Sequence, residues 1–291
     1  MDLVRAADAY FDAVPRQGAD AIEVGPFTLF RTRGAWNYYA RPTVGGRQPV
    51  TGADLAELDR VRSELALPLA LEWLPDCCPS LEAVARDYGL VVHDYVLMSL
   101  EAGAAERGGL STPAEPGRDT PAASGVSVRL VDPADPEDPA VPAARAVADV
   151  AFGPAGSAPG RAGVDERNEM LGLLSPLLVE QVRERIATGA MVLAVAERDP
   201  EGVVGSGAYQ PVGDVAEIVG VATLPALRCQ GVATALSALL ARAAFADGIT
   251  LLVLSAGSES VARVYAASGF QRTGRSLAAE PPSGDDGGAV P

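Results

Sequence analysis

The sequence predicts a mixed α/β protein of 291 residues that is organised in two halves. Strand-like apolar runs and helical segments interleave along most of the chain. A stretch rich in Ala, Gly, Pro, Ser and Thr interrupts them between Glu101 and Ser127. The hydrophobic content of 48% is sufficient for real cores and is not typical of a disordered chain.

The first half contains a mixture of strands and helices. The clearest helix is 53–65, because Leu55, Leu58 and Val61 recur along one face. A helix at 80–88 ends at Gly89, a residue type that often terminates helices. The strands are expected at 21–31, 34–41, 69–74 and 90–100.

The second half shows a clearer succession. A strand at 126–131 is followed by helices at 142–152 and 168–187, and then by three strands at 191–198, 202–210 and 216–223. A helix at 232–246, a strand at 250–255, a helix at 258–267 and a strand at 270–275 complete it. The turn signal DPEG joins two of these strands and indicates an antiparallel meander.

These patterns predict four segments. Residues 1–104 form a first domain, 105–125 a flexible linker, 126–279 a second domain and 280–291 a disordered tail.

Charge and composition exclude several functions. A formal charge of −15 argues against binding to nucleic acid or to an anionic membrane, and favours neutral or cationic small molecules as substrates. The chain contains no lysine, which excludes Schiff-base and P-loop lysine chemistry. Three cysteines and one histidine suit neither a disulfide framework nor a zinc site, so we expect no metal. Without an apolar leader or membrane span, we expect a soluble cytoplasmic protein.

The most informative stretch is ATLPALRCQGVATAL, from Ala222 to Leu236, which leaves a strand and enters a helix. Gly231 lets the backbone approach a bulky anion, and the amides at a helix start point toward it. Arg228 can add a charge-assisted contact to a phosphate. By itself the R-x-x-G-x-A pattern is also compatible with an ordinary strand-to-helix turn in which the glycine aids packing.

With its surroundings, this stretch resembles the GCN5-related N-acetyltransferase (GNAT) superfamily. AEIVGVATLPALRCQGVATAL resembles the fourth strand, the (Q/R)-x-x-G-x-(G/A) loop and the following helix. LLVLSAGSESVARVYAASGFQRTG resembles the fifth strand, the next helix and the terminal Y-x-x-x-G-F. The resemblance implies a mixed central sheet flanked by helices, and acetyl-CoA as cosubstrate.

The resemblance also implies which residues hold the cosubstrate. The pantetheine arm pairs with the fourth strand as an added strand would. The backbone amides of the loop bind the diphosphate, with the Arg228 side chain beside them, and Ser258 stands where the family often has an asparagine. The expected binding residues are Val221, Ala222, Thr223, Arg228, Cys229, Gln230, Gly231, Val232, Ala233, Thr234 and Ser258.

Two side chains are candidates for catalysis. Glu217 lies where several family members place a general base, but it is also compatible with a solvated residue in an enzyme that uses a water chain. Tyr265 matches the family tyrosine that protonates the sulfur of coenzyme A. The spacing of Val261, Val264, Tyr265 and Ser268 is equally compatible with a ring that only packs. We interpret the lone histidine, His93, as structural.

The first half ends in a strand, helix and strand that resemble the end of a GNAT domain, without the R-x-x-G-x-G/A pattern. We interpret it as a degenerate GNAT-like half of a tandem protein; a distinct α/β cap is the alternative. The family usually has one more strand after G-F, for which RSLAAEPPSGDD leaves little room. We therefore expect the first half to cover the exposed edge of the last strand.

These observations predict a bacterial N-acyltransferase that moves an acetyl or longer acyl group from coenzyme A to a small-molecule amine. Alternatives are a protein or peptide N-acetyltransferase, an acyl-CoA sensor without turnover, and a structural partner-binding module. Neither the acceptor amine nor the oligomeric state follows from the sequence.

Overall fold

The structure, a computed structural model, describes residues 2–34, 37–46, 48–107, 120–121, 125–153 and 158–282. These residues form two compact units. The first unit runs to Met98 and includes Ser255–Glu259 and the chain from Arg272 onward. The second unit comprises Ser99–Leu254 and Ser260–Gln271.

This division differs from the segmentation proposed from the sequence in three places. Residues 99–104 cluster with the second unit, whereas Ser255–Glu259 and the last strand cluster with the first unit rather than with 126–279. Most of the expected linker, 108–119 and 122–124, lies outside the described residues. Most of the expected tail, 283–291, also lies outside them.

The first unit begins with a helix that the sequence analysis did not predict, α1 (Leu3–Arg16). Its N-cap is Asp2, whose carboxylate accepts a hydrogen bond from the amide of Arg5 at 3.2 Å. The other elements of this unit are β1 (Ala19–Val24), β2 (Phe27–Thr32), β3 (Arg41–Pro42), α2 (Gly52–Glu64), β4 (Leu71–Trp73), α3 (Leu81–Asp87), most of β5 (Val91–Glu101) and most of β12 (Gln271–Glu280).

The strand expected at 21–31 is instead the hairpin β1–β2, because Gly25 adopts a positive φ of 55° that turns the chain. The strand expected at 34–41 is reduced to β3 at its end, and Ala35 and Trp36 lie outside the described residues. The helices expected at 53–65 and 80–88 are confirmed as α2 and α3.

Strands β1-β2-β3 form a three-stranded sheet, and the other strands of the first unit follow one another in the order β4-β12-β5 within a nine-stranded sheet. Strand β12 pairs antiparallel with β4, with Leu277 opposite Trp73 and Ala279 opposite Leu71. These four side chains are buried in one apolar cluster with Phe27 and Leu55. The N-terminal part of the chain therefore covers the edge of the last strand, as the sequence analysis expected.

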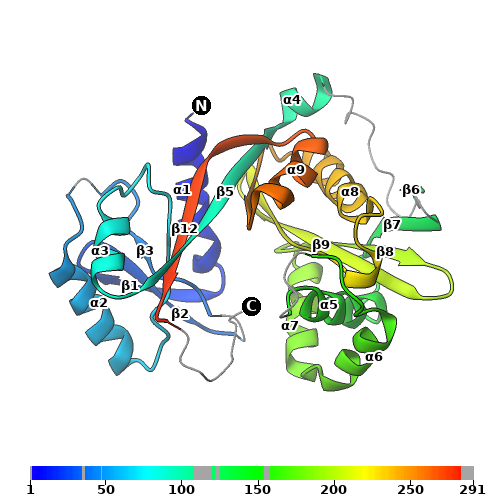
Figure 1. Cartoon of the computed structure of the whole chain (residues 1–291), viewed down its shortest axis with the longest axis horizontal. Coiled ribbons are helices and arrows are strands. Elements are labelled where there is room, and N and C mark those ends of the chain that lie inside the picture. The colour runs from blue at the N-terminus through cyan, green and yellow to red at the C-terminus, as the bar shows by residue number, and fades with distance from the viewer. Residues whose placement is uncertain are drawn as a thin grey trace. The chain divides into compact units, whose positions relative to one another are not determined.

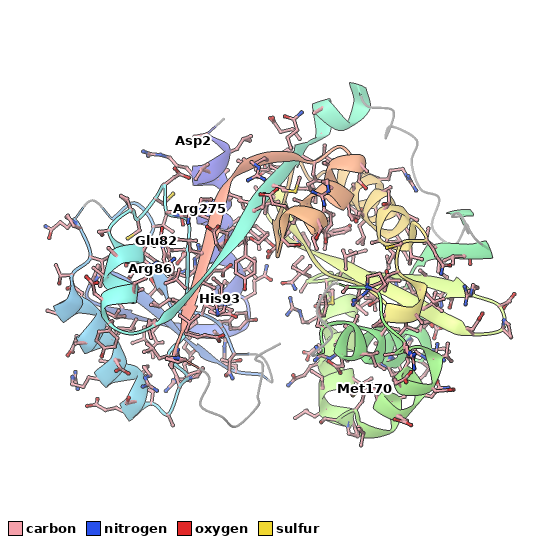
Figure 2. The ribbon with its side chains drawn as sticks, viewed as in Figure 1. Asp2, Glu82, Arg86, His93, Met170 and Arg275 are labelled. Carbon is pink, nitrogen blue, oxygen red and sulfur yellow. The ribbon has the colours of Figure 1, made fainter. Side chains whose placement is uncertain are left out.

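Polar contacts also join the last strand to the N-terminal part of the chain. Figure 2 labels Arg275 of β12 and Glu82 of α3, whose side chains approach to 3.5 Å. Arg275 also forms an ion pair with Asp94 of β5 at 2.6 Å. On another part of the unit, the fully buried Arg41 forms ion pairs with Asp8 at 3.3 Å and Glu72 at 3.0 Å.

From residue 126 onward, the second unit follows the predicted succession except at one helix. Its elements are α4 (Ala102–Arg107), β6 (Thr120–Pro121), β7 (Val126–Leu130), α5 (Ala140–Ala151), α6 (Val164–Leu173), α7 (Pro176–Ala187), β8 (Val192–Arg198), β9 (Gly202–Val212), β10 (Val215–Thr223), α8 (Val232–Ala246), β11 (Leu251–Ala256) up to Leu254, and α9 (Glu259–Ala267) from Ser260. The single helix expected at 168–187 is wrong. It consists of two helices, because the chain becomes extended at Leu174 and restarts at Pro176, a residue suited to a first helical turn.

The sheet of this unit has the order β11-β10-β9-β8-β7-β6 (Figure 1). Helices α5 and α8 cover its opposite faces, as adjacent residues of β9 show. The hydroxyl of Ser206 donates to the carbonyl of Ala144 in α5 at 3.1 Å, whereas the missing Cβ of Gly205 faces Val232 in α8.

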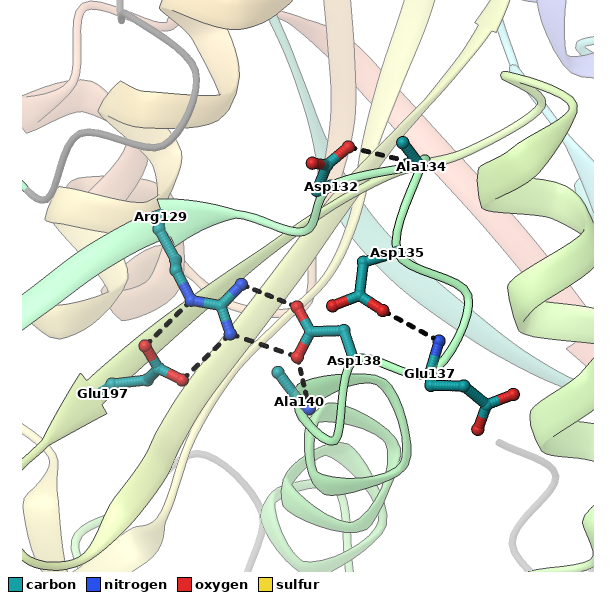
Figure 3. A network of polar contacts seen from close by, with 8 residues as sticks. All are labelled: Arg129, Asp132, Ala134, Asp135, Glu137, Asp138, Ala140 and Glu197. Atoms are coloured by element: carbon teal, nitrogen blue, oxygen red, sulfur yellow. Dashed lines mark hydrogen bonds and ion pairs between the residues drawn. The ribbon is translucent and has the colours of Figure 1, made fainter.

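A charged network holds the start of α5 on this sheet (Figure 3). Arg129 of β7 donates two hydrogen bonds to Asp138, at 2.8 and 3.2 Å, and two to Glu197 of β8, at 3.0 and 3.2 Å. The Asp138 carboxylate also accepts a hydrogen bond at 2.8 Å from the amide of Ala140, the first residue of α5. The hydrogen bonds from Arg129 lower the pKa of Asp138.

Candidate functional site: a strand fork that leads to a helix N-terminus

The centre of the second unit is a fork between two parallel strands. β10 and β11 pair only at Val215–Leu251, Ala216–Leu252 and Glu217–Val253. Beyond Glu217, β10 continues to Thr223 without pairing to β11. One side of the β10 backbone is thus available for an extended ligand that adds to it as a strand would.

Glycine helps to shape the fork. Pairing of β10 with β9 shifts register between Val219 and Ala222, and Gly220 in this bulge has φ of 61°. A bulge bends its strand and increases the local twist, and a side chain at this φ would be strained. The bulge lies directly after the point where β10 and β11 part.

The loop after β10 presents a helix N-terminus. Cys229 has φ of 63° and Gly231 has φ of 79°, and α8 begins at Val232 as predicted. The first four amides of a helix have no acceptor within the helix, and glycine as N-cap has no side chain to accept from them. These donors, together with the helix dipole, are suited to bind an anion.

Two glycines of β9 that the sequence analysis missed allow this arrangement. A Cβ at Gly205 would lie 2.7 Å from Cγ1 of Val232 and 3.1 Å from the carbonyl oxygen of Ala222. A Cβ at Gly207 would lie 3.1 Å from Cγ2 of Val221. The first turn of α8 and the bulged strand can therefore lie close to β9 only because these positions lack side chains.

The cofactor-binding residues expected in the second unit lie in one continuous stretch along the fork and the loop. Ala222, Thr223 and Val232 are buried, Cys229 and Gly231 are exposed, and Val221, Arg228, Gln230, Ala233 and Thr234 are half-buried. The Thr223 hydroxyl, on a residue 7% exposed, has no hydrogen-bond partner among the described residues, which fits a polar ligand at this position. Ser258 is half-buried and belongs to the first unit.

Arg228 lies directly before the loop amides and donates hydrogen bonds to backbone carbonyls. Its Nη2 donates to the carbonyl of Ala151 at 2.7 Å and its Nε to the carbonyl of Thr223 at 3.3 Å. Its Nη1 donates to the carbonyl of Ala158. The guanidinium therefore binds backbone oxygens at the site, and burial lowers its pKa.

The structure brings the two candidate catalytic residues within electrostatic reach of each other. Tyr265 of α9 is buried, with its ring packed edge-on against Phe270 at 6.0 Å between centroids. Burial, and secondarily the charge of Glu217, raise the pKa of Tyr265 to about 12. The phenol therefore keeps its proton at neutral pH and can act as a donor.

His93 and Cys77 are distant in sequence from Glu217 and Tyr265. In the first unit, Nε2 of His93 lies 3.3 Å from the carboxylate of Glu280, and burial raises the pKa of Cys77 to about 12. Among the described residues, no group of three or more metal-ligating side chains is placed to hold an ion. Within the same residues, no helix has the length and apolar character needed to cross a bilayer.

Comparison with known proteins gives a family match for one segment of the chain. Residues 167–270 match the model of the acetyltransferase (GNAT) family. No curated protein matches the sequence. The segment that contains the fork, the loop and Tyr265 is therefore a GNAT-family domain, and this family transfers acyl groups from coenzyme A.

Similar solved structures extend the shared fold over almost the whole chain. A GCN5-related N-acetyltransferase from Kribbella flavida is 19% identical, with a TM-score of 0.66 and coverage of 98% of this chain and 97% of that chain. A GCN5-related N-acetyltransferase from Sphaerobacter thermophilus is 16% identical, with a TM-score of 0.55 and coverage of 96% and 89%. A tandem GNAT protein from the clavulanic acid biosynthesis pathway is 18% identical, with a TM-score of 0.52 and coverage of 89% and 79%.

Proposed function

We propose that this protein is an N-acyltransferase that moves an acetyl or longer acyl group from coenzyme A to the amine of a small molecule. The observation that carries the proposal is the continuity of the fork and the loop. A strand edge from Ile218 to Ala222 that does not pair with β11 leads, through residues 223–228, to the amides of Cys229–Thr234. An extended arm that ends in a diphosphate matches both parts, because the strand edge takes the arm and the helix start takes the anion.

Glu217 and Tyr265 supply the proton transfers in this proposal. Glu217 accepts a proton from the attacking nitrogen, as the new carbon–nitrogen bond forms at the thioester carbonyl. Tyr265 gives its proton to the sulfur as the carbon–sulfur bond breaks, so the products are an amide and a free thiol. Glu217 is half-buried at the point where the two strands part, which suits a group that meets an acceptor there.

We also propose that the first half is a degenerate GNAT-like domain and that the protein is a tandem GNAT. The succession α3–β5 and the sheet β4-β12-β5 support this proposal, as does the fold shared over almost the whole chain. No R-x-x-G-x-G/A pattern precedes a helix in that half, so we place the cosubstrate in the second unit alone. The cytoplasmic location and a small neutral or cationic acceptor remain part of the proposal.

A thiol-release assay tests the function directly. The full chain is incubated with acetyl-CoA or longer acyl-CoA thioesters and a library of small amines, and free coenzyme A is measured. We expect amine-dependent release with one class of acceptor. Binding of coenzyme A without release by any amine or peptide would instead favour the sensor, and release only with peptides would favour a protein acetyltransferase.

The variants Glu217→Gln and Tyr265→Phe separate turnover from binding. Each should lower kcat by about 10² or more, in line with the loss of a general acid or base, while coenzyme A still binds. Tyr88→Phe is a matched control, because Tyr88 is exposed in the first unit and hydrogen-bonded to Asp59. A variant of Glu217 that retains full turnover would show that a water chain, rather than this carboxylate, removes the proton.

A further inference from the structure

The guanidinium of Arg228 joins three separate parts of the second unit. It donates to the end of α5 at Ala151, to Ala158 in the segment before α6, and to the last residue of β10, Thr223. All three acceptors are neutral carbonyl oxygens. Arg228 is the residue immediately before the loop amides that we assign to the diphosphate.

Backbone hydrogen bonds reinforce the same connection. The amide of Gly160 donates to the carbonyl of Pro225 at 3.2 Å, and the amide of Ala226 donates to the carbonyl of Ala162 at 3.0 Å. A Cβ at Gly160 would lie 3.1 Å from Cβ of Pro225, so the two segments are in close contact. Residues 158–163 are thus fastened to the turn 224–227 that leads into the loop.

The bonding of Arg228 limits what its side chain can do for a ligand. A guanidinium has five N–H donors in a rigid planar fork, and here Nε, Nη1 and Nη2 all donate to backbone. To contact a diphosphate through the same donors it would have to release these carbonyls, and the bonds to Ala151 and Thr223 are partly buried, so their loss is costly. Burial lowers the pKa of Arg228, which agrees with a guanidinium held among backbone carbonyls.

We propose that Arg228 is a positioning residue, which fixes the amides of Cys229–Thr234 by fastening residues 158–163 to the turn before them, and does not itself bind the diphosphate. This inference deepens the proposed function and rests on it. Binding of a diphosphate at the loop and ordering of the backbone at residues 158–163 are then coupled, because the Arg228 side chain is bonded to both segments. Loss of this fastening weakens cosubstrate binding without removing a group that handles protons.

Substitution by lysine distinguishes positioning from direct contact. Lysine keeps the positive charge, but its single ammonium cannot span three separated carbonyls. We expect Arg228→Lys and Arg228→Ala to weaken coenzyme A binding to a similar extent, about tenfold or more, in calorimetric titrations of the full chain. At saturating acetyl-CoA, kcat should stay within about twofold of the wild-type value, so the effect falls on KM.

The salt dependence of binding gives a second readout. If Arg228 does not pair with the diphosphate, the slope of log Kd against log salt is unchanged in Arg228→Ala. Arg161→Ala is the matched control, since Arg161 is an exposed cation in the segment 158–163. A lysine variant with nearly wild-type affinity, or a flatter slope in Arg228→Ala alone, would overturn the proposal and make Arg228 a phosphate ligand.

Hydrogen exchange keeps the proposal testable if a variant fails to fold. In the wild-type chain, coenzyme A should slow amide exchange in residues 158–163 as well as at the start of α8. Binding without any added protection at 158–163 would overturn the coupling. A wild-type chain that does not bind coenzyme A contradicts the proposed function instead, so the two failures are distinguishable.

Discussion

Glu217 on β10 and Tyr265 on α9 influence each other electrostatically, because the carboxylate adds to the effect of burial that raises the pKa of the phenol to about 12. The two residues come from separate parts of the GNAT-family segment, 48 positions apart as the numbering shows. Glu217 is positioned by β10, the first strand of the fork. Tyr265 is positioned by α9, the helix that follows the second strand, β11. The fold thus brings the proposed acceptor and the proposed donor of protons into one electrostatic environment.

The first prediction concerns the titration of Tyr265. Removal of the carboxylate charge in Glu217→Gln should lower the pKa of Tyr265, because a nearby negative charge disfavours the phenolate. An ultraviolet phenolate titration of the folded chain should therefore show one tyrosine ionising at lower pH in Glu217→Gln than in wild type. Tyr265→Phe identifies this tyrosine by loss of its signal. An unchanged titration in Glu217→Gln would contradict the coupling.

The second prediction concerns Gly205, under the first turn of α8. A methyl group there would contact Val232 and the Ala222 carbonyl, so Gly205→Ala should displace the loop by a few tenths of an ångström. Because the site is preorganised, this shift should weaken coenzyme A binding by about tenfold or more. The matched control is Gly172→Ala in α6, where a Cβ meets nothing within 4 Å. Calorimetry should show wild-type affinity for the control. Equal affinities in all three proteins would contradict the packing argument.

The third prediction concerns the buried Arg41 in the first unit. Arg41→Met leaves Asp8 and Glu72 without their cation, and removal of one partner of a buried ion pair costs about 3 kcal/mol of unfolding free energy. Burial already raises the pKa of Asp8, so the carboxyl should take up a proton at higher pH in the variant. Chemical denaturation measures the loss. The control is Arg60→Ala, which removes exposed ion pairs and should change the free energy of unfolding only slightly.

The fourth prediction concerns the pairing of β12 with β4. A fragment of residues 126–279 lacks β4 and β5, so β12 is left without the strands on either side of it. Unpaired strand edges favour aggregation, and the buried face of Leu277 and Ala279 is exposed as well. We expect the fragment to be insoluble or inactive. A soluble fragment with full activity would show that the first half is dispensable for the fold.

The sequence predicted the elements whose pattern is local. The helix at 232–246 has the same bounds in the structure, because an apolar strand, a glycine and an apolar helical run follow one another without interruption. Gly231 could be recognised as the loop glycine for the same reason. The split at Pro176 was missed since the helical period continues across it, although Pro at a first helical position was a usable signal.

Features that depend on contacts distant in sequence were harder to predict. The pairing of β12 with β4 and the clearance at Gly205 both require partners that no local pattern specifies. The hydrogen bonds from Arg228 to Ala151 and Ala158 could not be predicted from the motif, because both acceptors are far from the loop in sequence. Helix α1 was overlooked although Asp2 is a typical N-cap.

The central claim is that the amides from Cys229 to Thr234 bind the diphosphate of coenzyme A. Calorimetric titration of the full wild-type chain with coenzyme A, and in parallel with pantetheine, which lacks the diphosphate, tests it most directly. The account predicts one binding site for coenzyme A and an affinity for pantetheine lower by about a hundredfold or more, as expected when several charge-assisted hydrogen bonds are lost. No heat with coenzyme A, or equal affinity for both compounds, would contradict it.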